Sequence, residues 1–299
     1  MKISAVICTR NRAAHLLQAI QSLRDQDIGS GNYEIVVVDN ASSDETANIV
    51  KPLAAEMPAV RYVFEKTPGL TNARNRGVRD ARAPMIAFLD DDALAGPAWL
   101  SSIVSAFEQF PDAMCVGGPI EPWFETPAPA WFPARLLGCY NRSYGPEARW
   151  YNFPHEQPVG CNMAFRKRCL EEIGGFNPLL TKYNDETELI GRMVNAGGKL
   201  FYQPAAVVKH LLPRERLTLT WQIRRHYHEG VSLAVAAGSN SPVPRMRRIK
   251  ELGGNLLRIG KRFARLALSR GSIERVEKLT DVSVLVGKTV YLTKSLRHP

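Results

Sequence analysis

Short apolar runs alternate with stretches of helical periodicity along the first half of the chain. Runs of this length are typical of strands buried in a sheet. Between the first two runs, residues Ala13–Arg24 repeat apolar side chains every three or four positions, as one face of a helix does. The strand candidates are Ile3–Cys8, Glu34–Val38, Arg61–Phe64 and Met85–Leu89. Strands that alternate with helices usually pair in parallel, so the pattern predicts an α/β fold with a mostly parallel central sheet flanked by helices.

The pattern changes twice further along the chain. Residues 122–158 are rich in proline and aromatic side chains and predict a long excursion over one face of the domain. Ordered helix and strand patterns resume at Gly160, and beyond Pro213 the chain turns helical and basic. We therefore expect one α/β domain over residues 1–212 and a helical region over residues 213–299.

Composition agrees with a globular protein. At 299 residues and 45% apolar side chains the chain can bury a full core, and no window approaches the length of apolar sequence that crosses a membrane. The first apolar stretch is too short for an export signal, so we expect a cytoplasmic protein with reduced cysteines. The cysteines match no zinc-binding spacing and are interpreted as packing residues: Cys8, Cys115, Cys139, Cys161 and Cys169.

The positive charge is concentrated at the end of the chain. Residues 240–299 hold 14 Lys and Arg and 4 Asp and Glu, which accounts for the whole net charge of +10, and residues 1–239 hold 25 of each sign. This asymmetry indicates an appendage with an anionic partner. Within residues 243–268 a set of apolar side chains shares one helical face: Met246, Ile249, Leu252, Leu256, Ile259, Phe263 and Leu266.

Such a helix has two interpretations. It can lie in an anionic membrane surface, or it can pack its apolar stripe on the catalytic domain or on a second subunit. Gly253 and Gly254 weaken a continuous helix, because glycine has low helical propensity. A second apolar segment follows at Val282–Leu292.

Three consecutive carboxylates, Asp90, Asp91 and Asp92, directly follow the apolar run Met85–Leu89. In open α/β sheets, ligand sites lie just past the carboxyl ends of such strands. If the chain stays extended, Asp90 and Asp92 point to one side and Asp91 to the other, which makes a D-x-D pair. A divalent cation such as Mg²⁺ or Mn²⁺ would relieve the repulsion between these anions. A solvated acidic turn is the alternative.

Asp39 ends the second strand candidate, where an acid commonly binds a ribose or base, or caps the next helix. The first strand is not followed by a glycine-rich turn, since the first glycine is Gly29. Phosphate-binding loops of dinucleotide enzymes and P-loop ATPases need glycine there, so both classes are disfavoured.

Seven motifs in order resemble family 2 glycosyltransferases of the GT-A fold, over about residues 3–230. The first four are Val6–Arg12, Val36–Asp44, Pro68–Gly77 and Phe88–Asp92. The last three are Val159–Arg166, Ile173–Phe176 and Asp185–Leu189. The resemblance implies a GT-A domain with a basic helical appendage, and an inverting transfer of one sugar from a nucleotide-diphosphate sugar to an acceptor hydroxyl.

The resemblance also implies the donor-binding residues. Thr9, Arg10 and Asp39 match positions that hold the nucleotide base, and Arg74 and Asn75 match a pair near base and ribose. In the D-x-D segment, Asp90 would meet the ribose, Asp91 belongs to the same nucleotide-sugar site, and Asp92 would bind the metal, Mn²⁺ or Mg²⁺. Asn162 matches a position at the sugar end of the pocket, and His210 matches a metal or diphosphate ligand of many relatives.

The catalytic base of the family lies in a Glu-Asp pair that opens a helix. Here the order is reversed to Asp185-Glu186, so Glu186 takes the position of the family's Asp but is one methylene longer. We expect one of the two to be the base and favour Asp185. The alternative is a pair of helix N-terminal acids stabilised by the helix dipole.

The expected partners follow from this assignment. They are a nucleotide-sugar donor, with a UDP-sugar the first choice, a saccharide or lipid-linked saccharide acceptor, an anionic membrane surface, a second copy of the chain, and no nucleic acid. The expected role is cell-surface polysaccharide or glycolipid assembly, peripheral on the inner face of the plasma membrane. Trp123, Trp131 and Trp150 could stack on sugar rings or pack in a core. A metal-dependent phosphatase or nucleotidyltransferase, and a non-catalytic polyanion binder, are the alternatives.

Overall fold

The computed structural model describes residues 1–138, 140–181, 183–239, 245–267, 269 and 271–297. The chain forms two compact units. The first contains Met1–Trp123, Cys139–Thr181 and Asp185–Leu211, and the second contains Phe124–Gly138, Lys182–Asn184 and Leu212–Pro299. The second unit thus includes two segments from earlier in the chain, which a division into residues 1–212 and 213–299 assigns to the first domain.

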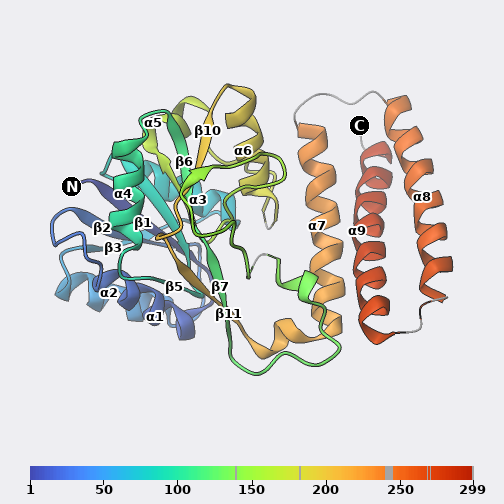
Figure 1. Ribbon diagram of the computed structural model, residues 1–299, viewed down its shortest axis with the longest axis horizontal. Helices are drawn as coiled ribbons and strands as arrows, with labels where there is room; N and C mark the ends of the chain where they lie inside the picture. Colours follow the sequence, from blue (N-terminus) through green and yellow to red (C-terminus); the bar gives the residue numbers. More distant parts are fainter. Residues whose placement is uncertain (139, 182, 240–244, 268, 270, 298–299) are drawn as a thin grey trace. The chain divides into compact units, whose positions relative to one another are not determined.

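An eight-stranded sheet forms the centre of the first unit, in the order β3-β2-β1-β4-β9-β6-β10-β8 (Figure 1). Strands β3, β2, β1 and β4 run parallel, as does the pair β6 and β10, whereas β9 and β8 are antiparallel to their neighbours. The strands are β1 Ile3–Thr9, β2 Tyr33–Asp39, β3 Val60–Phe64, β4 Met85–Asp90, β6 Ala113–Gly117, β8 Arg149–Trp150, β9 Met163–Arg166 and β10 Lys199–Tyr202. The predicted mostly parallel α/β sheet is confirmed.

Alternate side chains of the central strands bury against helices on the two faces of the sheet. On β1, Ile3, Ala5 and Ile7 join one core cluster, and Val6 joins the other. Helices α1, α2 and α4 pack on the first face, and α3, α5 and α6 pack on the second. The helices are α1 Ala13–Arg24, α2 Thr46–Glu56, α3 Leu70–Asp80, α4 Trp99–Gln109, α5 Lys167–Glu172 and α6 Asp185–Asn195. Because both faces are covered, the strands read as continuous apolar runs.

A second, three-stranded sheet has the order β5-β11-β7. Its strands are β5 Ala93–Ala95, β7 Ile120–Phe124 and β11 Val208–Leu212. In the antiparallel pair of β5 and β11, His210 is the partner of Ala93. Since Ala93 directly follows the acidic run, this pairing brings a histidine from late in the sequence next to Asp90–Asp92.

The second unit contains three long helices, α7 Leu219–Ser239, α8 Arg245–Ala267 and α9 Ser272–Arg297, and the 3-10 turns η1 Ala134–Leu137 and η2 Arg214–Leu217. Helix α9 lies between α7 and α8 (Figure 1). Glycines let α7 and α9 approach closely, because a Cβ on Gly230 or on Gly287 would lie 2.0 Å from a carbonyl oxygen of the other helix. Helix α8 continues through Gly253 and Gly254, so the expected weakening does not interrupt it.

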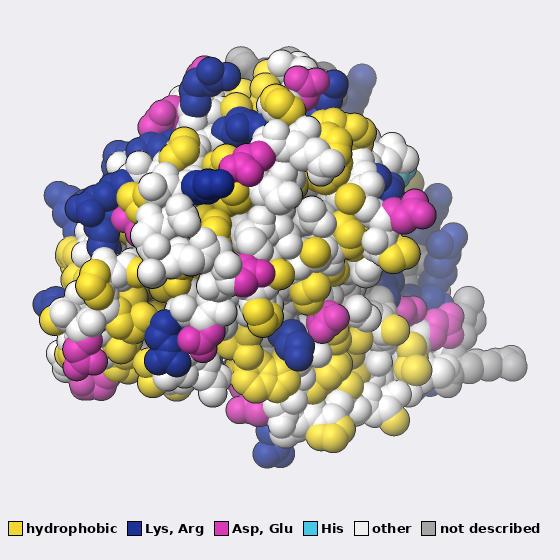
Figure 2. All heavy atoms as spheres, turned by 60° about the vertical axis from the view of Figure 1, so that its left-hand side comes forward, with side chains coloured by type: hydrophobic (Ala, Val, Ile, Leu, Met, Phe, Trp, Pro, Cys, Tyr) yellow, Lys and Arg dark blue, Asp and Glu magenta, His cyan; other side chains and the backbone are white. Residues whose placement is uncertain are grey.

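No helix in the described part of the chain is both long and apolar enough to span a bilayer. On the face of the molecule in Figure 2, basic and acidic side chains are mixed among hydrophobic and neutral ones. The four described cysteines, Cys8, Cys115, Cys161 and Cys169, are in no disulfide bond, and Cys139 lies outside the described residues.

Candidate active site

The carboxyl ends of three adjacent parallel strands bring the first site residues together. Thr9 at the end of β1 is in register with Asp39 at the end of β2, and Cys8 is in register with Asp90 at the end of β4. Polar side chains follow each strand where its apolar run stops, so they collect along one edge of the sheet.

The three consecutive carboxylates have different partners. The Thr9 hydroxyl donates a hydrogen bond of 2.7 Å to Asp91, while Asp90 and Asp92 both face His210, whose Nε2 lies 3.6 Å and 3.1 Å from their carboxylate oxygens. Asp90 and Asp92 thus share one neighbour, as expected, but β4 ends at Asp90 and the next two acids lie in a turn, so the segment does not stay extended. Arg12 contacts the Asp92 carboxylate and lies 3.5 Å from Asp91, so a guanidinium supplies part of the positive charge that these anions need.

Burial and charge shift the pKa values of these groups in opposite directions. Burial raises the pKa of Asp91 to about 7, although the positive charge of the nearby Arg12 acts to lower it. The negative charge of Asp92 adds to the rise. Burial also acts to raise the pKa of Asp90, but the interaction with His210 and the charge of Arg74 bring it below its ordinary value. For His210 burial acts to lower the pKa, and the carboxylates of Asp92 and Asp90 outweigh it, so the pKa is raised.

The donor atoms around His210 suit a divalent cation. Ligand atoms of Asp90, Cys161 and His210 lie within 4.8 Å of one another, and Asp92 approaches the same imidazole nitrogen. Carboxylate oxygens and an imidazole are ligands that Mn²⁺ accepts, and carboxylates suit Mg²⁺. The His210 ring also packs against Tyr140, with ring centroids 4.6 Å apart and an angle of 33° between the ring planes, which limits its rotation. The residues present therefore fit a metal ion.

Arg74 is buried and connects three segments of the site. Its guanidinium forms an ion pair with Asp185, lies 3.5 Å from an Asp90 oxygen, and donates a hydrogen bond of 3.3 Å to the Gly160 carbonyl. The ring centroids of Phe88 and Phe176 are 5.9 Å and 5.5 Å from it. Arg74 comes from α3, Asp90 from β4 and Asp185 from α6, so one side chain links the D-x-D segment to the acidic pair.

The two members of the acidic pair have different surroundings. Asp185 is 1% exposed and is held by Arg74, whereas Glu186 is half-buried. Burial raises the pKa of Glu186 to about 8, with a further rise from the charge of Asp185. A general base works best when its pKa lies near the working pH, so the environment favours Glu186 over Asp185 as a proton acceptor.

Asp39 is buried and already has two hydrogen-bond donors. The Tyr62 hydroxyl donates to one carboxylate oxygen at 2.7 Å, and the Ser42 amide donates to the other at 2.9 Å. Each oxygen can accept a further hydrogen bond, so the carboxylate can still bind a base or ribose. Arg10, in the loop after β1, is exposed.

The two asparagines that were expected to contact the sugar donor form hydrogen bonds with backbone groups of the protein instead. Asn75 donates to the Phe176 carbonyl and accepts from the Phe176 amide, both at 2.8 Å. Asn162 is fully buried, donates to the carbonyls of Pro119 and Ala206, and accepts from the Trp99 indole. This geometry gives both residues a structural role, and the expected donor contacts gain no support from it.

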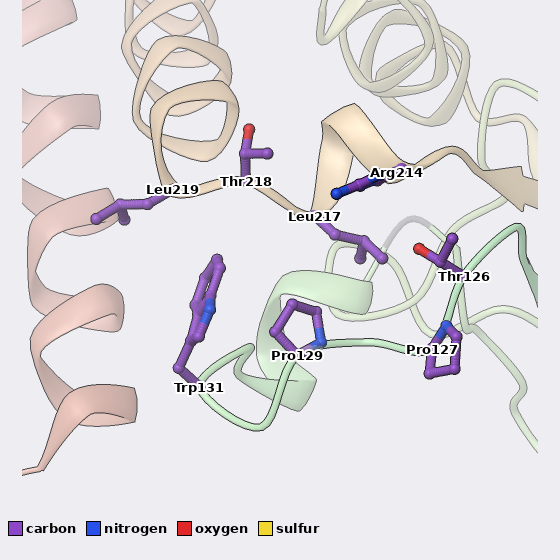
Figure 3. Close-up of a pocket in the computed structure, with 8 residues that line it drawn as sticks. All are labelled: Thr126, Pro127, Pro129, Trp131, Arg214, Leu217, Thr218 and Leu219. Carbon is purple, nitrogen blue, oxygen red and sulfur yellow. The ribbon is translucent and has the colours of Figure 1, made fainter.

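The tryptophans of the long excursion have three different environments. Trp150 packs edge-on against Phe110 and Phe201, and Trp123 is 37% exposed. Trp131 lines a cavity of about 360 Å³ in the second unit (Figure 3). Its indole stands beside Leu219 at one end of the cavity, and Arg214 lies at the other. The other lining residues are Thr126, Pro127, Pro129, Leu217 and Thr218.

The sequence interpretation missed two residues of the site. Arg12 lies in the motif after the first strand, where only Thr9 and Arg10 were expected to bind the donor. Cys161 was interpreted as a packing residue. The signal for Arg12 was the repulsion among three carboxylates, which a nearby arginine can relieve as a metal does. No local signal marks Cys161, because its proximity to His210 depends on the pairing of distant strands.

Comparisons with known proteins identify the same family. The model of the glycosyl transferase family 2 matches residues 4–174, more than half of the chain. The chain is 26% identical over 251 residues to the glucosyl-dolichyl phosphate glucuronosyltransferase of Haloferax volcanii, covering 79% of this chain and 77% of that protein. It is 25% identical over 234 residues to the succinoglycan biosynthesis protein ExoM of Rhizobium meliloti, covering 77% and 73%.

A solved structure shares the fold. The mannosyltransferase PcManGT from Pyrobaculum calidifontis, in complex with GDP-Man and Mn²⁺, has a TM-score of 0.63 to this chain at 19% sequence identity. The match covers 97% of this chain and 87% of the mannosyltransferase. The likeness confirms the GT-A fold.

Proposed function

The chain belongs to glycosyl transferase family 2, and we propose that it is an inverting, metal-dependent enzyme that moves one sugar from a nucleotide-diphosphate sugar to an acceptor hydroxyl. The observation that carries this proposal is the connection made by Arg74 between Asp90 and the acidic pair. It joins groups suited to the leaving diphosphate with a proton acceptor suited to the incoming hydroxyl. A nucleotidyltransferase would need a glycine-rich loop near the start of the chain, and the first glycine is Gly29.

The donor nucleotide would lie along the carboxyl ends of β1, β2 and β4. Asp39 and Thr9, with Arg10 at the rim, are proposed to hold the base, and Asp90 with Asp91 to hold the ribose. Asp39 supports this because its carboxylate keeps unused acceptor capacity at a sheet edge. A UDP-sugar is the first choice for the donor.

Asp92 and His210, with Asp90 beside them, are proposed to hold Mn²⁺ or Mg²⁺. When bound, such an ion neutralises the negative charge that develops on the departing diphosphate. Arg12 lies next to the same carboxylates and can contribute a fixed positive charge to the same task.

Glu186 is proposed as the general base. It would take the proton of the acceptor hydroxyl as that oxygen forms a bond to the anomeric carbon and the bond to the diphosphate oxygen breaks. Attack opposite to the leaving group inverts the anomeric centre. Asp185 would act through Arg74, as a positioning residue that keeps the start of α6 against the D-x-D segment.

The acceptor is proposed to be a saccharide or a lipid-linked saccharide used in cell-surface polysaccharide or glycolipid assembly, at the inner face of the plasma membrane. Two relatives carry names from lipid-linked glycan and polysaccharide biosynthesis, and both align over most of their length. Such an acceptor attacks through a hydroxyl group, and a base in the site is needed to take the proton of that hydroxyl.

A donor-hydrolysis screen tests the proposal, because many transferases slowly hydrolyse their own donor. UDP-, GDP- and dTDP-sugars are incubated with the full-length protein and Mn²⁺, and release of nucleoside diphosphate is measured. We expect release from one nucleotide class, and loss of release in Asp92→Asn. Turnover that persists undiminished in excess EDTA would contradict the metal-dependent mechanism.

A further inference from the structure

Helix α8 uses only part of its apolar surface to pack. Leu252, Ile259 and Leu266, with the buried Asn255, form the stripe that is at least half-buried, and Arg262 on the same side forms an ion pair of 3.1 Å with Asp281 of α9. One part of the stripe therefore packs, but on α9, a partner that the sequence interpretation did not name, since it expected the catalytic domain or a second subunit. The second apolar segment, Val282–Leu292, also packs, since its Val282, Leu285 and Leu292 are buried.

The remaining apolar side chains of α8 face outward. Ile249, Leu256, Leu257 and Phe263 are 45%, 55%, 62% and 50% exposed. Met246, the first residue of the expected stripe, has a side chain outside the described residues. At 100° per residue, Ile249, Leu256 and Phe263 lie within about 40° of one another and Leu257 lies about 80° from Ile249. Large apolar side chains exposed together on one helix mark contacts with a partner or a membrane. We call these four residues the outer face of α8.

Basic side chains border the outer face. At 100° per residue, Lys250, Lys261 and Arg265 lie on the side of the helix next to Leu257, away from α9. None of these three forms an ion pair with any residue that the structure describes. Arg258 lies on the same side and reaches only the Asn255 side chain. Glu251 is the one acid in the sequence of α8, so the border is strongly positive.

We propose that the outer face of α8 docks on an anionic lipid bilayer, with its apolar side chains in the interface and its basic border against the headgroups. A helix that combines an apolar flank with a basic flank fits this environment, and each basic residue near an anionic surface raises binding about fivefold. The inference rests on the proposed location at the inner face of the plasma membrane and identifies the surface that docks there, and it does not depend on the identity of the donor.

A second copy of the chain fits the outer face less well. Ile249, Leu256 and Phe263 recur every seven residues, a spacing that helix pairs use. However, pairing two α8 helices would bring their basic borders together without acidic partners, because Glu251 is the only acid on the helix. An anionic surface satisfies the apolar and basic groups at the same time.

Vesicle co-sedimentation of the full-length protein tests the proposal. Vesicles of phosphatidylcholine alone are compared with vesicles that contain about one-third phosphatidylserine, at low and high salt. We expect binding to the anionic vesicles only, weakened by salt. Leu256→Ser with Phe263→Ser removes apolar contacts, and Phe64→Ser is the matched control, because Phe64 is also 50% exposed but lies on β3.

A charge-reversal pair tests the basic border. Lys261→Glu with Arg265→Glu is expected to weaken binding by about 25-fold or more, since two contributions of about fivefold are lost. Lys66→Glu with Arg168→Glu changes the net charge equally at exposed sites of the first unit and is expected to leave binding unchanged. Donor hydrolysis measured on every variant separates a failure of docking from a failure of the proposed transferase.

Three outcomes would overturn the proposal. They are equal binding to both kinds of vesicle, binding by neither, and α8 variants that bind as tightly as their controls. If the protein binds neither kind of vesicle, sedimentation equilibrium shows whether the outer face is used by a second copy instead. A wild-type dimer that becomes monomeric in the Leu256 and Phe263 variant would identify the outer face as an interface between copies.

Discussion

The choice between Asp185 and Glu186 as the base can be tested through pH. Burial and the neighbouring Asp185 raise the pKa of Glu186 to about 8, so its carboxylate form is scarce at pH 7 and dominant at pH 9. If Glu186 accepts the acceptor proton, kcat rises about tenfold between pH 7 and pH 9 and then levels off, because only the deprotonated base is active.

Two conservative variants separate the candidates. Glu186→Gln is expected to lose about 10²–10⁴-fold in kcat at every pH, while donor binding survives. Asp185→Asn is expected to remain active, with the rising limb of its profile moved to lower pH, because the charge of Asp185 raises the pKa of Glu186. The measurement is the rate of sugar transfer with saturating substrates between pH 6 and pH 9.5, for the three proteins in parallel.

Thermal stability supplies an independent check on the sign of the shift. The folded-state pKa of Glu186 lies above its ordinary value of 4.5, so unfolding releases a proton and stability falls as pH rises from 4.5 towards about 8. Glu186→Gln is therefore expected to raise Tm at pH 9 and to leave it nearly unchanged at pH 4. Asp185→Asn leaves the buried Arg74 without its closest partner and is expected to lower Tm.

An active Glu186→Gln variant together with an inactive Asp185→Asn variant would refute this reasoning and would identify Asp185 as the base.

Other predictions concern residues around this pair. Asp92→Asn is expected to lower donor turnover by roughly 10²-fold or more and to abolish its dependence on added Mn²⁺, as measured by release of nucleoside diphosphate; a variant as active as the wild type would exclude Asp92 as a ligand. Arg74→Gln removes a charge that lowers the pKa of Glu186, so the rising limb of the pH profile is expected to move to higher pH, and a limb that stays in place would argue against the link. Asn75→Ala loses both hydrogen bonds to Phe176 and is expected to lower the free energy of unfolding by about 1–3 kcal/mol, with an unchanged KM for the donor as the sign of a structural role.

The sequence by itself determined the local features of this protein. Strands β1, β2 and β4 follow from apolar runs that lie within one or two residues of the observed bounds, because both faces of the sheet are covered and the central positions of each strand are apolar. The acidic run Asp90–Asp92 was recognised from its place after an apolar strand, although β4 ends at Asp90 and the next two acids lie in a turn. Seven motifs in order were sufficient to identify the family.

Only the tertiary structure decided which distant side chains meet. The pairing of β5 with β11 brings His210 to the acidic run, and the packing of α3 near the start of α6 brings Arg74 to Asp185. These contacts join residues more than a hundred positions apart, and no periodicity in the sequence records them. The same reason explains Asn75 and Asn162, whose motif positions suggested a ligand but whose amides hold backbone groups.

The apolar stripe of α8 shows the same division between sequence and structure. A helical period places Leu252, Leu256, Ile259 and Phe263 within one broad face, and the sequence cannot say which part of that face is covered. Packing on α9 covers Leu252 and Ile259 in part and leaves Leu256 and Phe263 exposed. Burial is a property of neighbouring elements, so the surface that remains for a partner appears only when those elements are in place.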